Sequence, residues 1–193
     1  SSMIGKNFMI ILLLYILLTI SYSLFLKIIP IIDCIVLAAL YTIRIIAGAI
    51  VINNTPSFWL IAFSILFFFS LAFLKRYSEL LSVKDLGEKI IHGRGYLSSD
   101  YPLILSLGVS SAIGSVIVMM LYLNSQEIIQ LYDYPQIVWF TIPTLLFWIS
   151  YIWLQANRGH MHDDPVIFAI KDRVSILSAI CFFVCIILGA RGF

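Results

Sequence analysis

The sequence predicts an all-α integral membrane protein in which six transmembrane helices form one helical domain over residues 1–193. Of its residues 62% are hydrophobic and 11% are charged, and the mean hydropathy is +1.05; soluble domains carry about 25% charged residues. Six apolar stretches approach or reach the roughly 20 residues that a helix needs to cross a membrane. This composition excludes a soluble globule, a disordered tail, a coiled coil and a nucleic-acid binder.

The six spans are expected at residues 8–26, 31–52, 57–74, 101–123, 136–154 and 174–190. Turn-forming residues separate them, and Pro30 and Pro135 stand where helices begin. Pro143 lies inside the fifth span and is expected to kink it. Residues 75–81 keep helical character beyond the third span. The cysteines at positions 34, 181 and 185 lie in apolar runs, so we interpret them as small hydrophobic residues and not as disulfide partners.

The basic residues predict the orientation of the bundle. Of the twelve, two lie on one side (Lys6 and Arg191), Arg44 lies within a span, and nine lie in loops on the other side: Lys27, Lys75, Arg76, Lys84, Lys89, Arg94, Arg158, Lys171 and Arg173. Loops rich in Lys and Arg stay in the cytoplasm. We therefore expect the three charged loops, and any polar chemistry, on the cytoplasmic face of a bacterial inner membrane.

The second span carries two charges that a plain bundle does not need. Asp33 stands near its start and Arg44 eleven residues later, on nearly the same helical face and about 16 Å apart along the axis. An arginine at the centre of a span costs roughly 2.5 to 3.5 kcal/mol on insertion scales. Arg44 is therefore expected to meet an anion, or, as the alternative, backbone carbonyls or a polar neighbour.

Two cytoplasmic loops offer further candidates. The first, residues 75–101, is by itself expected to be a solvated positive-inside loop. The alternative is that the two glycines flanking Arg94 let backbone N–H groups and a guanidinium approach a phosphate. The second contains His160, His162, Asp163 and Asp164. Successive loop residues seldom converge on one ion, so a transition-metal site is disfavoured. An edge that faces Mg²⁺ or phosphate fits these carboxylates better.

The order and spacing of these residues resemble the UbiA prenyltransferase superfamily. The matching residues are Tyr22-Ser23-Leu24-Phe25-Leu26-Lys27, Pro30, Asp33, Arg44, Ala47-Gly48-Ala49, Ser57-Phe58-Trp59, Lys75-Arg76, Glu79, Arg94-Gly95-Tyr96-Leu97, Tyr101, residues 158–166 and Asp172-Arg173. The likeness covers nearly the whole chain. It is strongest to the branch of decaprenyl-phosphate phosphoribosyltransferases and to related bacterial proteins with a haloacid-dehalogenase-like domain ahead of the membrane part.

The chain departs from the family pattern in one respect. Family members have nine helices and an early N-D-x-x-D motif that binds Mg²⁺ together with the substrate diphosphate. This chain has six expected spans and no such motif. It therefore resembles the last six helices of a larger membrane enzyme, whose other helices would supply most of the Mg²⁺ ligands. Within this chain only Asp163 and Asp164 are weak candidates as metal ligands.

The resemblance implies a transferase that moves a 5-phosphoribosyl group from 5-phosphoribosyl diphosphate to a polyprenyl phosphate in the lipid. It implies that Asp33 and Glu79 are catalytic and orient the bases or hold ribose hydroxyls. The implied substrate-binding residues are Lys27, Arg44, Lys75, Arg76, Arg94 and Tyr101. Two alternatives stay open: a prenyltransferase that moves a prenyl group from prenyl diphosphate to an acceptor, and a non-catalytic subunit for lipid binding or transport.

We predict that residues 80–95 and 157–170 are cytoplasmic, because nine basic residues lie on that side and two on the other. The test is labelling of Ser82→Cys and Asn157→Cys in intact cells, in a background without the three native cysteines. An impermeant thiol reagent is expected to leave both unlabelled until the membrane is opened. Labelling of either position from outside would reverse the orientation.

Overall fold

The computed structural model describes residues 5–52, 54–85, 93–125, 132–161 and 164–190. The secondary-structure elements of these residues are helices, and the chain divides into two compact units, residues 1–111 and 112–193. The chain passes from one unit to the other within helix α4 (Tyr101–Leu123). Each unit is described below by itself.

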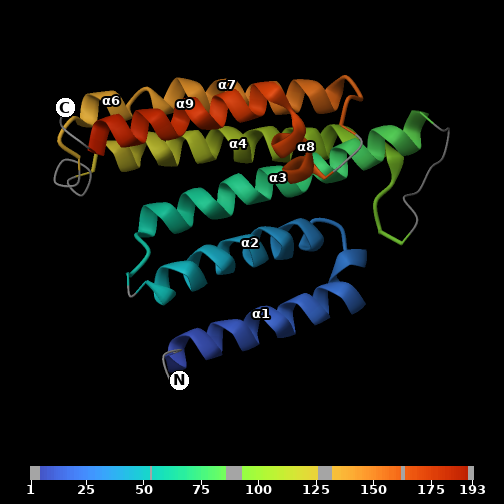
Figure 1. Cartoon of the computed structure of the whole chain (residues 1–193). Helices are drawn as coiled ribbons and strands as arrows, with labels where there is room; N and C mark the ends of the chain where they lie inside the picture. Colours follow the sequence, from blue (N-terminus) through green and yellow to red (C-terminus); the bar gives the residue numbers. More distant parts are fainter. Residues whose placement is uncertain (1–4, 53, 86–92, 126–131, 162–163, 191–193) are drawn as a thin grey trace. The chain divides into compact units, whose positions relative to one another are not determined.

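The first unit contains the beginning of α4 and three long helices: α1 (Lys6–Leu24), α2 (Ile32–Val51) and α3 (Phe58–Asp85). A short 3-10 helix, η1 (Leu26–Ile28), lies between α1 and α2, and a second one, η2 (Ser98–Asp100), precedes α4. The three long helices run antiparallel in sequence order, so that α2 contacts both α1 and α3 (Figure 1). This central position lets α2 bury a face that includes Asp33, Cys34 and Leu40.

Among the residues that the structure describes, five helical segments are long and apolar enough to cross a membrane: Ile32–Val51, Phe58–Val83, Ser98–Leu123, Pro135–Asn157 and Arg173–Ala190. The apolar part of α1, Phe8–Leu24, is shorter. Many of its large side chains are exposed, Ile10 and Leu13 among them, as suits a helix whose solvent is lipid. The prediction of an all-α membrane protein is thus confirmed, and a sixth span stays a prediction.

Helix α3 extends well past the predicted end of its span at residue 74. It continues to Asp85, which confirms the expected helical character of residues 75–81. Arg76 and Glu79 therefore stand on a rigid helix and not on a loop. Since they are three residues apart, they lie on one face of that helix.

In the second unit the predicted fifth span is broken in two. Helix α6 (Pro135–Val138) ends before Trp139 and helix α7 (Thr141–Asn157) begins two residues later. Pro143 has no N–H to donate to the carbonyl of Trp139, four residues earlier, and its ring crowds that group. The carbonyl instead accepts from the N–H of Ile142 at 3.1 Å. The break confirms the expected kink.

Helix α9 (Arg173–Ala190) contacts α6, α7 and the short α8 (Pro165–Lys171). The sequence did not predict α8. Its N-cap is Asp164, whose carboxylate accepts from the N–H of Val166 at 3.0 Å. The Asp164 side chain therefore stabilises a helix start. Asp163 lies outside the described residues, so its predicted role in metal binding is not addressed by the structure.

A strained turn joins η1 to α2. The N–H of Ile32 donates to the carbonyl of Pro30 at 2.8 Å, and Ile31 between them has φ +69° and ψ −45°. This is a γ-turn in the half of φ space that a β-branched residue rarely occupies. Gly95 packs directly against this turn, and its N–H donates to the carbonyl of Ile28 at 3.0 Å. This contact holds the loop around residue 95 at the start of α2.

We predict that Gly95→Ala destabilises the protein. A Cβ at this position would lie 2.6 Å from the carbonyl oxygen of Ile28 and 2.8 Å from Cδ of Pro30, and overpacking of this kind costs about 1 to 3 kcal/mol. The matched control is Gly48→Ala, because a Cβ on Gly48 has no atom within 4 Å. Thermal unfolding in detergent is expected to show a lower Tm for the first variant only. Equal Tm values would contradict the close packing of Gly95.

Candidate functional site

The candidate site is a buried cluster of charged side chains around Asp33, in the first turn of α2. The Asp33 side chain is 0% exposed. One of its oxygens, Oδ2, lies 3.1 Å from Nε of Arg76 and 3.4 Å from an Nη of Arg94. The other, Oδ1, accepts a hydrogen bond from the Tyr96 hydroxyl at 2.6 Å. Three side chains thus compensate one buried carboxylate, as a charge in a low-dielectric interior requires.

Arg76 is the central cation of this cluster and is also 0% exposed. It is held between the two carboxylates, since one Nη pairs with Oε2 of Glu79 while Nε faces Asp33. Its other terminal nitrogen, Nη2, is buried without a hydrogen-bond partner. Buried guanidinium nitrogens are normally paired, so this atom identifies Arg76 as a group able to donate to an additional acceptor.

Arg94 reaches the cluster from the loop that precedes η2. Its Nε lies 3.5 Å from Oε2 of Glu79 and an Nη lies 3.5 Å from the Tyr22 hydroxyl on α1. Partial burial lowers the pKa of Arg94, but the hydrogen bond to Tyr22 and the negative charges of Glu79 and Asp33 outweigh this, so its pKa is raised. Arg94 therefore stays positively charged at any physiological pH.

Tyr96 joins the cluster to the strained turn. Its hydroxyl accepts from the N–H of Ile31 at 2.6 Å, donates to Asp33 and lies 3.7 Å from Sγ of Cys34. Burial, the nearby Cys34 and the bond to Asp33 raise the pKa of Tyr96. The phenol therefore keeps its proton and acts as a permanent donor to the Asp33 carboxylate.

The cluster is electrically balanced but unequally exposed. Two carboxylates face two guanidiniums, and the Asp33 and Arg76 side chains are 0% exposed, whereas Arg94 is 20% and Glu79 is 33% exposed. The buried pair is fixed in place. Arg94 and Glu79 form an accessible edge, where the Arg94 guanidinium can bind an anion such as a phosphate through two parallel hydrogen bonds.

The structure brings together four of the predicted site residues: Asp33, Glu79, Arg76 and Arg94. Three others, Lys27 on η1, Lys75 on α3 and Tyr101 at the start of α4, are half-buried. The expectation of a plain solvated loop at residues 93–96 is wrong at Tyr96, which is buried, and at Arg94, which is ion-paired.

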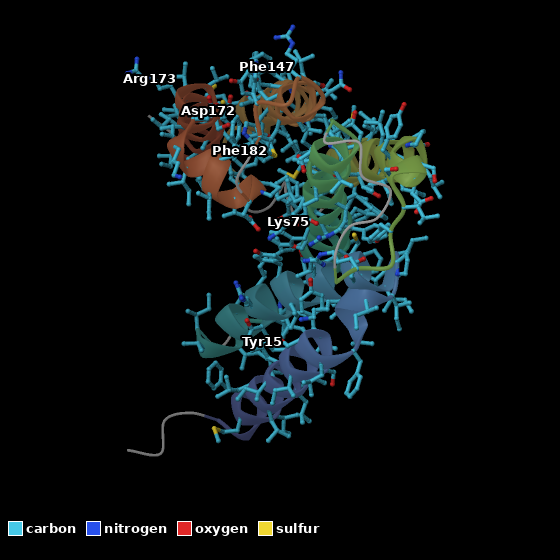
Figure 2. All side chains as sticks on the ribbon, turned by 90° about the vertical axis from the view of Figure 1, so that its right-hand side faces the viewer. Tyr15, Lys75, Phe147, Asp172, Arg173 and Phe182 are labelled. Carbon is cyan, nitrogen blue, oxygen red and sulfur yellow. The ribbon has the colours of Figure 1, made fainter. Side chains whose placement is uncertain are left out.

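Arg44 lies apart from this cluster. Its Nε and one Nη donate to the Tyr15 hydroxyl at 3.1 and 2.5 Å, and its guanidinium lies 5.3 Å from the Tyr15 ring centre and 5.0 Å from that of Tyr41. Tyr15 lies on α1, where Figure 2 labels it. The polar neighbour expected as the alternative to an anion is thus present. The guanidinium itself remains exposed, so anion binding at Arg44 stays a prediction.

Sequence reasoning missed Tyr96 and Tyr22 as members of the site. Both stand in the segments that carry the family resemblance, yet neither is charged, so a search for charges in an apolar chain passes over them. The only local signal is the position of Tyr96, which follows Arg94 and Gly95. Its bond to Asp33, 63 residues away, exists only in the tertiary structure.

Comparisons with known proteins give two relatives. No known family profile matches the chain. It is 36% identical over 174 residues to the uncharacterized protein y4nM of Sinorhizobium fredii; the matched region covers 90% of this chain and 34% of that protein. It is 33% identical over 150 residues to the nodulation protein NoeC of Azorhizobium caulinodans; the matched region covers 76% of this chain and 48% of that protein. The chain thus spans about a third and about half the length of these curated relatives.

We predict that Tyr96→Phe lowers stability, because the buried Asp33 carboxylate and the N–H of Ile31 each lose a partner. An unsatisfied buried polar group costs about 1 to 3 kcal/mol. Tyr134→Phe is the matched control, since Tyr134 is exposed. Chemical or thermal unfolding of the two variants in detergent measures the difference. A Tyr96→Phe protein as stable as the control would show that this hydroxyl does not hold the cluster.

Proposed function

We propose that this chain is the membrane portion of a UbiA-type transferase that moves a 5-phosphoribosyl group from 5-phosphoribosyl diphosphate to a polyprenyl phosphate. The observation that supports the proposal best is the accessible edge of the Asp33 cluster, where Arg94 and the buried Arg76 pair with the same Asp33 oxygen. Four residues to which the family resemblance assigns roles meet there. The names of the two relatives state no activity that bears on this reaction.

The proposed chemistry needs positive charge beside the leaving group. As the bond from the ribose carbon to the diphosphate breaks, negative charge grows on the leaving oxygens and the carbon becomes cationic. Preorganised donors at the position of that growing charge lower the barrier. Arg94, on the accessible edge, can serve as such a donor. Arg76 adds a second positive charge beside the same carboxylate, and Asp33, itself held by Tyr96, fixes Arg76 in place. The acceptor phosphate is already ionised near neutral pH, so the reaction needs no strong general base.

The family resemblance implies Mg²⁺, and the described residues do not fit it. No group of three or more His, Cys, Asp or Glu side chains among them is arranged to hold a metal ion. Both oxygens of Asp33 are also engaged, by two guanidiniums and a phenol. Under the proposal the described residues therefore do not hold the metal by themselves. Under the proposal its ligands belong to the N-D-x-x-D helices of the complete enzyme.

The proposal extends to the rest of the enzyme. We assign the six expected spans of this chain to the last six helices of a nine-helix bundle in a bacterial inner membrane, with the cluster at the cytoplasmic face. Both relatives are considerably longer than the region that matches this chain. They therefore have room for three more helices or for a haloacid-dehalogenase-like domain, which supports this assignment.

The test uses the complete gene product in membranes, with labelled 5-phosphoribosyl diphosphate and a polyprenyl phosphate. Transfer appears as label that partitions into the lipid phase. We predict that Arg94→Gln lowers kcat about a hundredfold or more, as expected for the loss of one charge-stabilising donor. The control is Arg173→Gln, which removes an exposed arginine at the start of α9 and is expected to keep full activity.

Each alternative has its own result in this assay. Incorporation from a labelled prenyl diphosphate, and none from 5-phosphoribosyl diphosphate, would replace the proposal by a prenyltransferase. Lipid binding without transfer from either donor would indicate a non-catalytic subunit. An Arg94→Gln protein with normal turnover would remove the cluster from the reaction, whatever the donor.

A further inference from the structure

The two carboxylates of the cluster are held very differently. Asp33 is 0% exposed and uses both oxygens, towards Arg76, Arg94 and Tyr96. Glu79 is 33% exposed and contacts the two arginines through a single oxygen, Oε2. Its contact with Arg94 is long, at 3.5 Å. Asp33 is therefore built into the fold, whereas Glu79 is attached at the edge.

The cost of moving each carboxylate away differs accordingly. Moving Asp33 away would leave the buried Arg76 guanidinium without this carboxylate and the Tyr96 hydroxyl without its acceptor. An uncompensated buried charge is strongly unfavourable. The Glu79 side chain is 33% exposed, so its carboxylate can leave the arginines without becoming a buried, uncompensated charge. Its two arginine partners, each of which contacts Oε2, can then pair with another anion in its place.

An anion with more charge than a carboxylate is the natural occupant of the vacated position. With Glu79 in place the cluster is neutral, because two carboxylates balance two guanidiniums. A diphosphate brings several charges and many acceptor oxygens to the same two arginines, and Arg pairs with phosphate in a bidentate manner. It can therefore outcompete a single carboxylate, while a monocarboxylate ligand has no such advantage.

We propose that Glu79 is an exchangeable counterion: its carboxylate occupies the arginine edge until a diphosphate group binds there and displaces it. This inference rests on the proposed function, because it assigns the diphosphate to the same cluster. It changes the role expected for Glu79 from an orienting group to a competitor of the substrate. Glu79 then selects for highly charged phosphates and keeps Arg76 and Arg94 compensated in their absence.

The experiment measures the Kd of inorganic diphosphate for the complete protein in detergent by calorimetry, with and without Mg²⁺. Glu79→Gln keeps the shape of the side chain but removes the competing charge, so Kd is expected to fall about tenfold, in line with the strength of one charge-assisted hydrogen bond. Arg94→Gln is expected to raise Kd by at least as much. Glu79→Asp keeps the charge on a shorter side chain and is expected to stay closer to the wild-type value. Asp172→Asn is the control for a general loss of negative charge, since this carboxylate contacts Tyr151 and Ser175, and its Kd is expected to be unchanged.

The outcomes separate this inference from the proposed function. A higher or unchanged Kd for Glu79→Gln, with normal diphosphate binding by the wild type, overturns the exchange and leaves the transferase proposal standing. A higher Kd that appears only with Mg²⁺ would make Glu79 a metal ligand and also overturns it. Failure of the wild type to bind diphosphate in either condition overturns both proposals. If Glu79→Gln has a strongly reduced Tm, the diphosphate Kd of Glu79→Asp is used in its place. A Kd of Glu79→Asp above that of the wild type contradicts competition between Glu79 and diphosphate.

Discussion

The structure of the first unit depends on the burial of one carboxylate in an apolar chain. Asp33 has no access to water, so it requires partners that are themselves held in place. Arg76 comes from α3, while Arg94 and Tyr96 come from the loop before η2. This single requirement ties the start of α2 to the extension of α3 beyond residue 74 and to the loop before η2.

The same requirement explains the irregular backbone beside the cluster. The Tyr96 hydroxyl bonds at once to Asp33 and to the N–H of Ile31, whose φ of +69° is unfavourable for a β-branched residue. Gly95 has no side chain and so can pack against the carbonyl of Ile28. Strain in a backbone persists where the surrounding contacts over-determine it, and such places are often functional sites.

Unequal exposure divides the cluster into a structural part and a chemical part. Asp33, Arg76 and Tyr96 are buried and fix the geometry, whereas Arg94 and Glu79 form an edge that a ligand can reach. Because Arg76 stands on a helix and contacts both carboxylates, it links the two parts. A rigid base under an accessible edge is the arrangement that precise recognition of an anion needs.

Apolar length and turn residues determined the spans, because the ability to cross a membrane is a local property of about 20 residues. The bounds of α4 and the kink at Pro143 follow from residues close to them in the chain. The short α8 and the long extension of α3 were harder to delimit, since amphipathic or polar helices carry weaker signals. For the site, the sequence singled out the costly charges Asp33, Arg76, Glu79 and Arg94 but not their pairing. Only the tertiary structure decided that Tyr96 holds Asp33, 63 residues away, and that Arg44 meets Tyr15 instead of joining the cluster, because contacts between distant segments depend on how helices pack and not on local composition.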